Sequence, residues 1–188
     1  MVYVIDESRG GDQVLAHRDV KDLQGLVGRP IALDRSSLSL YMLARAFASQ
    51  GLPPPAPSQL RHLPPAWWEA ALRQKTVAGV VSYPPRSKRL RRALPLDTVF
   101  TSRQLPNEIL DVLAVEPEFL RLLPEAMLAL VQGWQAVRRE ERMRPVDVGR
   151  EMADHLGLET GAGTGTLGGS AIPGCRSSTS CSTHARTT

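Results

Sequence analysis

Hydroxyl and carboxylate side chains stand where predicted strands end, and they are the groups in this sequence best placed to do chemistry. Asp6, Glu7 and Ser8 follow the apolar run 2–5, which is typical of a short buried strand. In open α/β sheets, ligands bind at the carboxyl ends of strands. A solvated turn is the alternative interpretation of such a polar loop. We therefore treat Asp6 and Ser8 as candidate ligand-binding residues.

Two adjacent serines, Ser36 and Ser37, follow a second apolar run, 30–33, and precede an amphipathic helix predicted to extend to about Gln50. A helix N-terminus carries unpaired N–H donors and a partial positive charge, so it receives small anions well. The alternative is that one of the serines serves as an N-cap. Two hydroxyls at this position favour an anion site, and Gly51 is predicted to end the helix at the C′ position.

Tyr83 ends the predicted strand 77–83 and is followed by two prolines that stiffen the turn. A tyrosine at the end of a strand can line a pocket and offer one hydroxyl. It can equally be a residue at the edge of the core. Tyr83 is thus the third place where the sequence suggests contact with a ligand.

The positive charge of the chain is concentrated in one segment, 86–92. This segment holds five cationic side chains, more than the whole net charge of +4. No aromatic residue is interleaved with them, as a nucleic-acid-binding strip would require. The run is therefore interpreted as a solvated helix face rather than a phosphate site, and no nucleic-acid partner is expected.

Catalysis, metal binding and cofactor binding find no support in the residue pattern. Ser8, Ser36 and Ser82 lack a G-x-S-x-G elbow, and the four histidines show no metal-ligand spacing. The segment 163–168 matches G-x-G-x-x-G but has no strand before it and no helix after it, so no dinucleotide cofactor is expected. The chain has no apolar run of about 18 residues, and its first residues lack the pattern of an export signal.

Strands and helices alternate along the chain, which predicts βαβ units and a largely parallel sheet. On the helix 64–74, Trp67, Ala71 and Leu72 are expected to share the buried side. Pro124 is expected to begin or break a helix in the long helical region that follows. The Gly-, Ser- and Thr-rich segment 160–188 is predicted to be a disordered tail. The predicted strands are 2–5, 13–17, 30–33, 59–63, 77–83, 98–101 and 109–115, and the last helix is 146–156.

The order of several motifs resembles one protein family. Val4-Ile5-Asp6-Glu7-Ser8, then Arg29-Pro30-Ile31-Ala32-Leu33, then Val77-Ala78-Gly79-Val80-Val81-Ser82-Tyr83-Pro84-Pro85 and finally Ala153-Asp154-His155-Leu156-Gly157 carry the resemblance. In this order they are similar to the periplasmic solute-binding proteins of nitrate/sulfonate/taurine ABC importers. The resemblance covers residues 1–159. Ala78 stands where the family usually has Asp.

The resemblance implies an α/β fold of the type II periplasmic-binding-protein kind, with two lobes joined by hinge strands. Residues 1–18 would form the hinge crossover and 19–103 a largely complete second lobe. Residues 104–159 would return to a partial first lobe and be mainly helical, before the tail 160–188. An export signal and half of the first lobe would precede these segments in the family, so a truncated form is expected.

The function that the resemblance implies is transport without catalysis. The chain would be the periplasmic, monomeric solute-binding component of an importer. Its partners would be a membrane permease and a small anionic solute, such as a sulfonate, taurine or a nitrate-like ion. The residues at family cleft positions are Asp6, Ser8, Ser36, Ser37 and Tyr83.

Two other uses of the same fold remain open at this point. One is the effector-binding domain of a transcription regulator, in which a helix-turn-helix precedes the sensor. The other is a pyrimidine-precursor synthase, which would need reactive His and Cys residues in its cleft.

Overall fold

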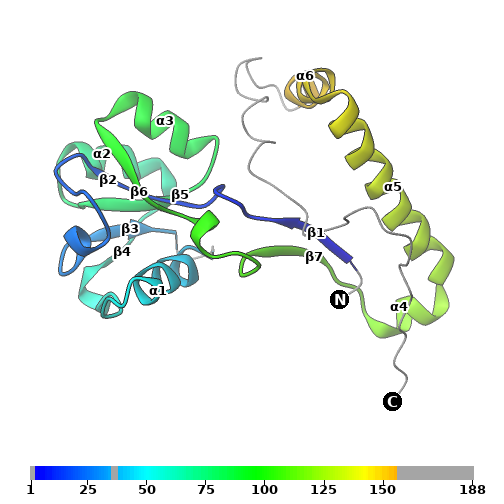
Figure 1. Ribbon diagram of the computed structural model, residues 1–188, viewed down its shortest axis with the longest axis horizontal. Helices are drawn as coiled ribbons and strands as arrows, with labels where there is room; N and C mark the ends of the chain where they lie inside the picture. Colours follow the sequence, from blue (N-terminus) through cyan, green and yellow to red (C-terminus); the bar gives the residue numbers. More distant parts are fainter. Residues whose placement is uncertain (1–2, 35–37, 156–188) are drawn as a thin grey trace.

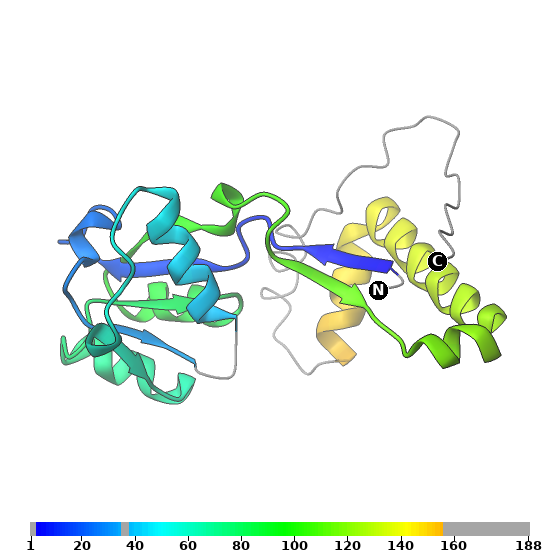
Figure 2. The same ribbon diagram turned by 90° about the horizontal axis from the view of Figure 1, so that it is seen from below.

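The computed structural model describes residues 3–34 and 38–155 of the 188-residue chain. These residues form an α/β part and a helical part, joined by a two-stranded ribbon (Figures 1 and 2). The predicted tail 160–188 lies outside the described residues.

The α/β part is built on a five-stranded sheet with the order β4-β3-β5-β2-β6. Strand β3 runs parallel to β4 and β5, whereas β2 runs antiparallel to β5 and β6. The prediction of a largely parallel sheet is wrong for β2. Because β2 leads the chain away from the ribbon and β6 leads it back, these neighbours must run in opposite directions. The strands are β2 (Gln13–His17), β3 (Ile31–Leu33), β4 (Leu60–His62), β5 (Gly79–Ser82) and β6 (Leu96–Thr101).

Helices cover both faces of this sheet. Helix α1 (Ser39–Ser49) covers one face, and α2 (Trp68–Arg73) and α3 (Arg86–Ala93) cover the other (Figure 1). Successive strand residues point to opposite faces, so Val14 packs with the α1 side and Leu15 with the α2 and α3 side. Each fully buried large apolar side chain contributes about 1.5–3 kcal/mol, which makes these two layers the main source of stability. Short 3₁₀ turns connect the elements at Gln24–Leu26, Pro57–Gln59, Pro65–Trp67 and Ser102–Gln104.

Helix α1 ends as predicted but begins later than predicted. Gly51 has a φ of +68°, and its N–H donates to the Ala48 carbonyl at 3.0 Å while the Leu52 N–H donates to the Phe47 carbonyl at 3.0 Å. These two bonds form a Schellman motif, which confirms Gly51 at C′. The N-cap position is Leu38, and Ser36 and Ser37, which the sequence predicts as caps, lie outside the described residues. Apolar periodicity identifies the buried face of a helix but not its first turn.

The two adjacent tryptophans have exchanged the roles that the sequence predicted. Trp68 is fully buried, and its indole N–H donates to the Leu63 carbonyl at 3.0 Å. Trp67 is 65% exposed, so its predicted place on the buried side is wrong. A 3₁₀ turn precedes α2, and its three residues per turn shift the phase of the helix.

The ribbon pairs β1 (Tyr3–Glu7) with β7 (Leu110–Leu113) in antiparallel register. After β7 the chain forms α4 (Pro117–Leu122), α5 (Pro124–Met143) and α6 (Pro145–His155). Pro124 is the first residue of α5, as predicted. The N–H groups of the first helical turn have no acceptor within the helix, so a proline there removes no hydrogen bond. No helix among the described residues combines the length and the apolar character that crossing a bilayer requires.

Candidate functional site

Three parallel strands end at the same edge of the sheet. Strand β2 begins just after the ribbon, and β5 runs opposite to it, so β5 and its parallel partners β3 and β4 all end toward the ribbon (Figure 1). We call this side the carboxyl edge, defined by the residues that follow these strands: Asp34, Leu63 and Tyr83. Ligands of open α/β sheets bind at such an edge.

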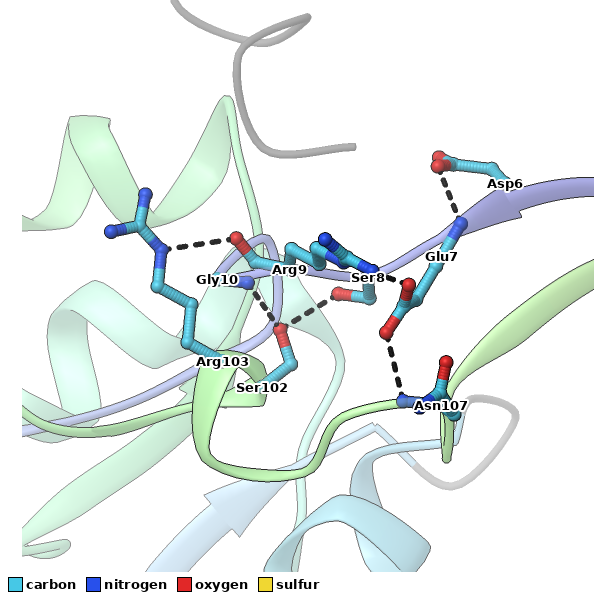
Figure 3. A network of polar contacts seen from close by, with 8 residues as sticks. All are labelled: Asp6, Glu7, Ser8, Arg9, Gly10, Ser102, Arg103 and Asn107. Atoms are coloured by element: carbon cyan, nitrogen blue, oxygen red, sulfur yellow. Dashed lines mark hydrogen bonds and ion pairs between the residues drawn. The ribbon is translucent and has the colours of Figure 1, made fainter. Parts of the chain in front are cut away.

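Ser8 lies where the chain crosses between the two parts, and its hydroxyl is engaged within the protein. It donates to Asp12 Oδ2 at 2.6 Å and lies 2.9 Å from the Ser102 hydroxyl (Figure 3). The backbone N–H of Ser8 donates to the Ile109 carbonyl at 2.9 Å. Ser102 also accepts from the Gly10 N–H at 2.7 Å. These bonds hold the segment before β2 against the segment after β6, so Ser8 positions the crossover.

Glu7 is the buried carboxylate of this crossover. Its side chain is fully buried and accepts from Arg9 Nε at 2.7 Å and from the Asn107 N–H at 2.8 Å (Figure 3). Both carboxylate oxygens therefore have a donor, one of them charged, so burial of Glu7 leaves neither oxygen without a hydrogen bond. Glu7 thus links the end of β1 to the segment that leads into β7.

Asp6 and Ser8 occupy different surroundings although only Glu7 lies between them in the chain. Asp6 Oδ1 accepts from the Glu7 N–H at 2.6 Å, and its side chain lines a cavity of about 260 Å³ with Asp111, Trp134 and Arg138. Burial raises the pKa of Asp6 above its ordinary value of 3.8. Asp6 therefore faces the helical part, beside α5, rather than the carboxyl edge.

Asp12 is a second carboxylate whose surroundings disfavour its charge. Burial raises its pKa above the ordinary 3.8, and the negative charge of Asp111 adds to this. The hydrogen bond from the Ser8 hydroxyl acts in the opposite direction. Asp12 is therefore a pH-sensitive group within the crossover.

Helix α1 is tied to the returning chain by one ion pair. Arg45 donates from Nε and Nη2 to the two carboxylate oxygens of Glu108 at 2.6 and 2.7 Å, and the Tyr41 hydroxyl donates to Glu108 at 3.1 Å. The hydrogen bond from Arg45 lowers the pKa of Glu108 below its ordinary 4.5. This fork-to-fork geometry fixes α1 relative to the segment just before β7.

At the carboxyl edge itself, Tyr83 is 44% exposed and lies beside an arginine. The guanidinium carbon of Arg86 is 5.9 Å from the centroid of the Tyr83 ring and 5.5 Å from that of Trp68. Tyr83 follows β5, and Trp68 begins the helix after β4. At this edge the guanidinium of Arg86 therefore lies beside two aromatic rings, of which Trp68 is buried and Tyr83 is exposed.

The structure brings only some of the predicted site residues together. Tyr83 lies at the carboxyl edge, Ser8 in the crossover and Asp6 toward the helical part, while Ser36 and Ser37 lie outside the described residues. Sequence reasoning did not single out Asp12, Ser102 or Asn107. One signal was present: Thr101-Ser102-Arg103-Gln104 has the spacing of a capping box, and the Gln104 side chain accepts from the Thr101 N–H at 3.0 Å.

Metal ligation is not suggested by the residues that the structure describes. Among residues 3–34 and 38–155, no three His, Cys, Asp or Glu side chains are grouped as a metal site would require. The groups available at the edge and the crossover are hydroxyls, aromatic rings and a guanidinium, which suit a polar or anionic organic ligand.

The structure has two parts, a ribbon between them and parallel strands that end toward that ribbon. This is the fold of type II periplasmic binding proteins, as predicted. Solved structures agree. The periplasmic aliphatic sulphonate binding protein SsuA from Escherichia coli aligns with a TM-score of 0.68 at 20% identity, over 90% of this chain and 60% of that one. The alkanesulfonate-binding protein SsuA from Xanthomonas axonopodis pv. citri, bound to MOPS, aligns with a TM-score of 0.64 at 18% identity over the same shares.

A third similar structure is described by its import system and not by its solute. It is the ligand binding component of an ABC-type import system from Staphylococcus aureus, with zinc bound, at a TM-score of 0.64 and 16% identity over 89% of this chain and 59% of that one. This chain thus spans about 60% of the length of the structures it matches. No protein-family model matches the sequence. No curated protein matches it either.

Proposed function

We propose that this chain is a solute-binding component of an ABC importer and carries no catalytic activity of its own. The observation that carries the proposal is the carboxyl edge of β3, β4 and β5, which faces a ribbon and helical part arranged as in solved importer binding proteins. In such a protein the solute binds between the two parts, and the crossover is where they move relative to each other. The Ser8–Ser102–Asp12 contacts lie at that crossover.

The proposed solute is a small organic or inorganic anion of the sulfonate, taurine or nitrate kind. Two similar structures are described as binding aliphatic sulphonates or alkanesulfonates. The physical argument is the supply of hydroxyl and N–H donors expected near Ser36, Ser37 and Tyr83, together with Asp6 facing away from that edge. A carboxylate facing the ligand would repel an anion, whereas hydroxyls donate hydrogen bonds without adding charge.

The proposed partners follow from the same role. A binding protein of this kind delivers its solute to a membrane permease, and its proposed location is the periplasm. We propose that it acts as a monomer. Ser36, Ser37 and Tyr83 remain the proposed residues around the solute, and Asp6 and Ser8 are proposed to belong to its hinge.

The test is a thermal-shift screen followed by calorimetric titration. The panel contains taurine, short alkanesulfonates, nitrate and bicarbonate, with thiamine-pyrimidine analogues as representatives of another solute class. A ligand at 100 times its Kd stabilises the native state by about 2.7 kcal/mol, which raises the melting temperature by several degrees. A panel in which no anion raises it contradicts the proposal, and a response to the pyrimidine analogues alone contradicts the anionic solute.

The serine pair provides a residue-level check, with a serine of α1 as the control. Replacing Ser36 and Ser37 together by Ala should weaken binding of the responding anion. Ser49→Ala is the control, because Ser49 is the last residue of α1 and its hydroxyl donates to the Ala46 carbonyl at 2.8 Å. Unchanged affinity in the double variant would exclude the two serines from the site.

A further inference from the structure

Arg86 is held over two aromatic rings at the carboxyl edge. Its guanidinium carbon is 5.5 Å from the ring centroid of the buried Trp68 and 5.9 Å from that of the half-exposed Tyr83. A guanidinium at these distances is attracted to the ring faces. The two rings therefore restrict where the charge of Arg86 can lie.

Arg86 lacks the carboxylate partner that comparable arginines have. Arg45 and Arg138, which are also partly buried, each pair with a glutamate. Within residues 3–34 and 38–155, Arg86 makes neither an ion pair nor a hydrogen bond with any other group. Withdrawing a charge from water is unfavourable unless an opposite charge or hydrogen-bond acceptor compensates it. A partly buried guanidinium with free donors is therefore suited to bind a ligand that carries a negative charge.

Two serines close to Arg86 in the chain have buried hydroxyl oxygens without partners among the described residues. Ser82 Oγ and Ser87 Oγ are buried on the β5–α3 segment, and Gln13 Oε1 belongs to the residue paired with Ser82 across the sheet. None of these three atoms has a hydrogen-bond partner in the described part of the chain. Buried polar atoms without partners are uncommon in native proteins, so the segment that carries Arg86 has hydrogen-bonding capacity that the described residues do not use.

We propose that Arg86 is the residue that binds the anionic head group of the solute, with Trp68 and Tyr83 as the platform that positions its guanidinium. The planar fork of arginine donates two parallel hydrogen bonds to an oxyanion such as a sulfonate. This inference rests on the proposed function and adds the group that selects the charge of the solute. It also separates Arg86 from the rest of the cationic segment 86–92, which the sequence assigns to a solvated face.

The test measures the binding of one anionic and one neutral ligand. It compares variants of Arg86 with a variant of a second arginine in α3. Butanesulfonate and butyl methyl sulfone have similar size and differ in charge. The variants are Arg86→Gln, Arg86→Lys and the control Arg89→Gln, which removes an exposed cation one turn further along α3. Affinities come from calorimetric titration at fixed salt, with the ligand-free melting temperature of each variant as the check on folding.

The unsubstituted protein should prefer butanesulfonate, and Arg86→Gln should weaken its binding about 10- to 100-fold, as expected for loss of charge-assisted hydrogen bonds. Arg86→Lys should lose a smaller part of the affinity, because it keeps the charge but not the fork. Binding of the sulfone should hardly change, and Arg89→Gln should resemble the unsubstituted protein.

Three outcomes overturn the proposal, and the last of them is distinguishable from the first two. If the unsubstituted protein binds butanesulfonate and Arg86→Gln binds it equally well, the role of Arg86 is refuted while the proposed function stands. The same conclusion follows if Arg89→Gln weakens binding as much as Arg86→Gln, since the effect is then general charge attraction. If the unsubstituted protein binds no anion at all, the proposed function fails and this inference fails with it.

Discussion

The hydroxyls of Ser8 and Ser102 lie 2.9 Å apart although 94 residues separate them in the sequence. Ser102 is fully buried, and it accepts a second hydrogen bond from the Gly10 N–H at 2.7 Å. This contact closes the crossover, because it joins the chain that enters the α/β part to the chain that leaves it. Any opening or closing between the two parts must take place around this contact.

Ser102→Ala is expected to destabilise the protein by about 1–3 kcal/mol, because it leaves the Gly10 N–H without its acceptor. Ser8→Ala should have a smaller effect, since Ser8 is only partly buried. The two effects should be coupled by at least about 0.5 kcal/mol in a double-mutant cycle, as expected for residues in direct contact. Urea unfolding of the four proteins measures this coupling. Strict additivity would show that the hydroxyl–hydroxyl contact contributes nothing.

Asp12 should make the stability of the protein depend on pH below neutrality. Its pKa is raised in the folded state, so the unfolded chain ionises first as the pH rises. Stability is therefore lost as the pH rises from about the ordinary value of 3.8 through the higher folded pKa. Asp12→Asn removes this loss, so the variant should gain stability relative to the unsubstituted protein between acid and neutral pH.

Denaturant unfolding at several pH values checks the Asp12 prediction. Asp154→Asn is the control, since Asp154 is exposed on α6. The quantity to compare is how the stability difference between Asp12→Asn and the unsubstituted protein changes with pH. Loss of the hydrogen bond from Ser8 Oγ lowers the stability of the variant by the same amount at every pH, so it does not affect this change. A relative stability of Asp12→Asn that stays constant or falls over this range would contradict the assignment.

The two adjacent tryptophans should respond very differently to truncation. Trp68→Ala is expected to destabilise the protein by about 3–5 kcal/mol, as for other buried aromatic residues. Trp67→Ala should change stability by less than about 0.5 kcal/mol, because its side chain is 65% exposed. Thermal melting of the two variants provides the comparison. Equal losses would mean that both indoles belong to the core.

Local patterns predicted the elements of this fold well. Apolar runs placed β2 at Gln13–His17 and β3 at Ile31–Leu33, and glycine and proline preferences placed the end of α1 at Gly51 and the start of α5 at Pro124. These features depend on side-chain period and backbone freedom, which neighbouring residues determine. The direction of β2 against β5 was not predicted, because strand pairing joins segments far apart in the chain.

The candidate site was less predictable than the elements, because its contacts cross the molecule. The polar loop 6–8 was identified from the sequence, but only the structure separates buried Glu7 from Asp6, which faces the helical part. The partner of Ser8 comes from the other crossing of the chain. Ser36 and Ser37 lie outside the described residues, so their role stays a prediction.

By itself the sequence determined the location of most strands and helices, the α/β class and the order of motifs that indicates a binding-protein fold. Only the tertiary structure decided which carboxylates are buried, which tryptophan enters the core and which cation of the segment 86–92 rests on aromatic rings. The physical reason is that hydrogen bonding and periodicity along a helix or strand are local. Burial and charge pairing depend on what the fold brings alongside each residue from distant parts of the chain.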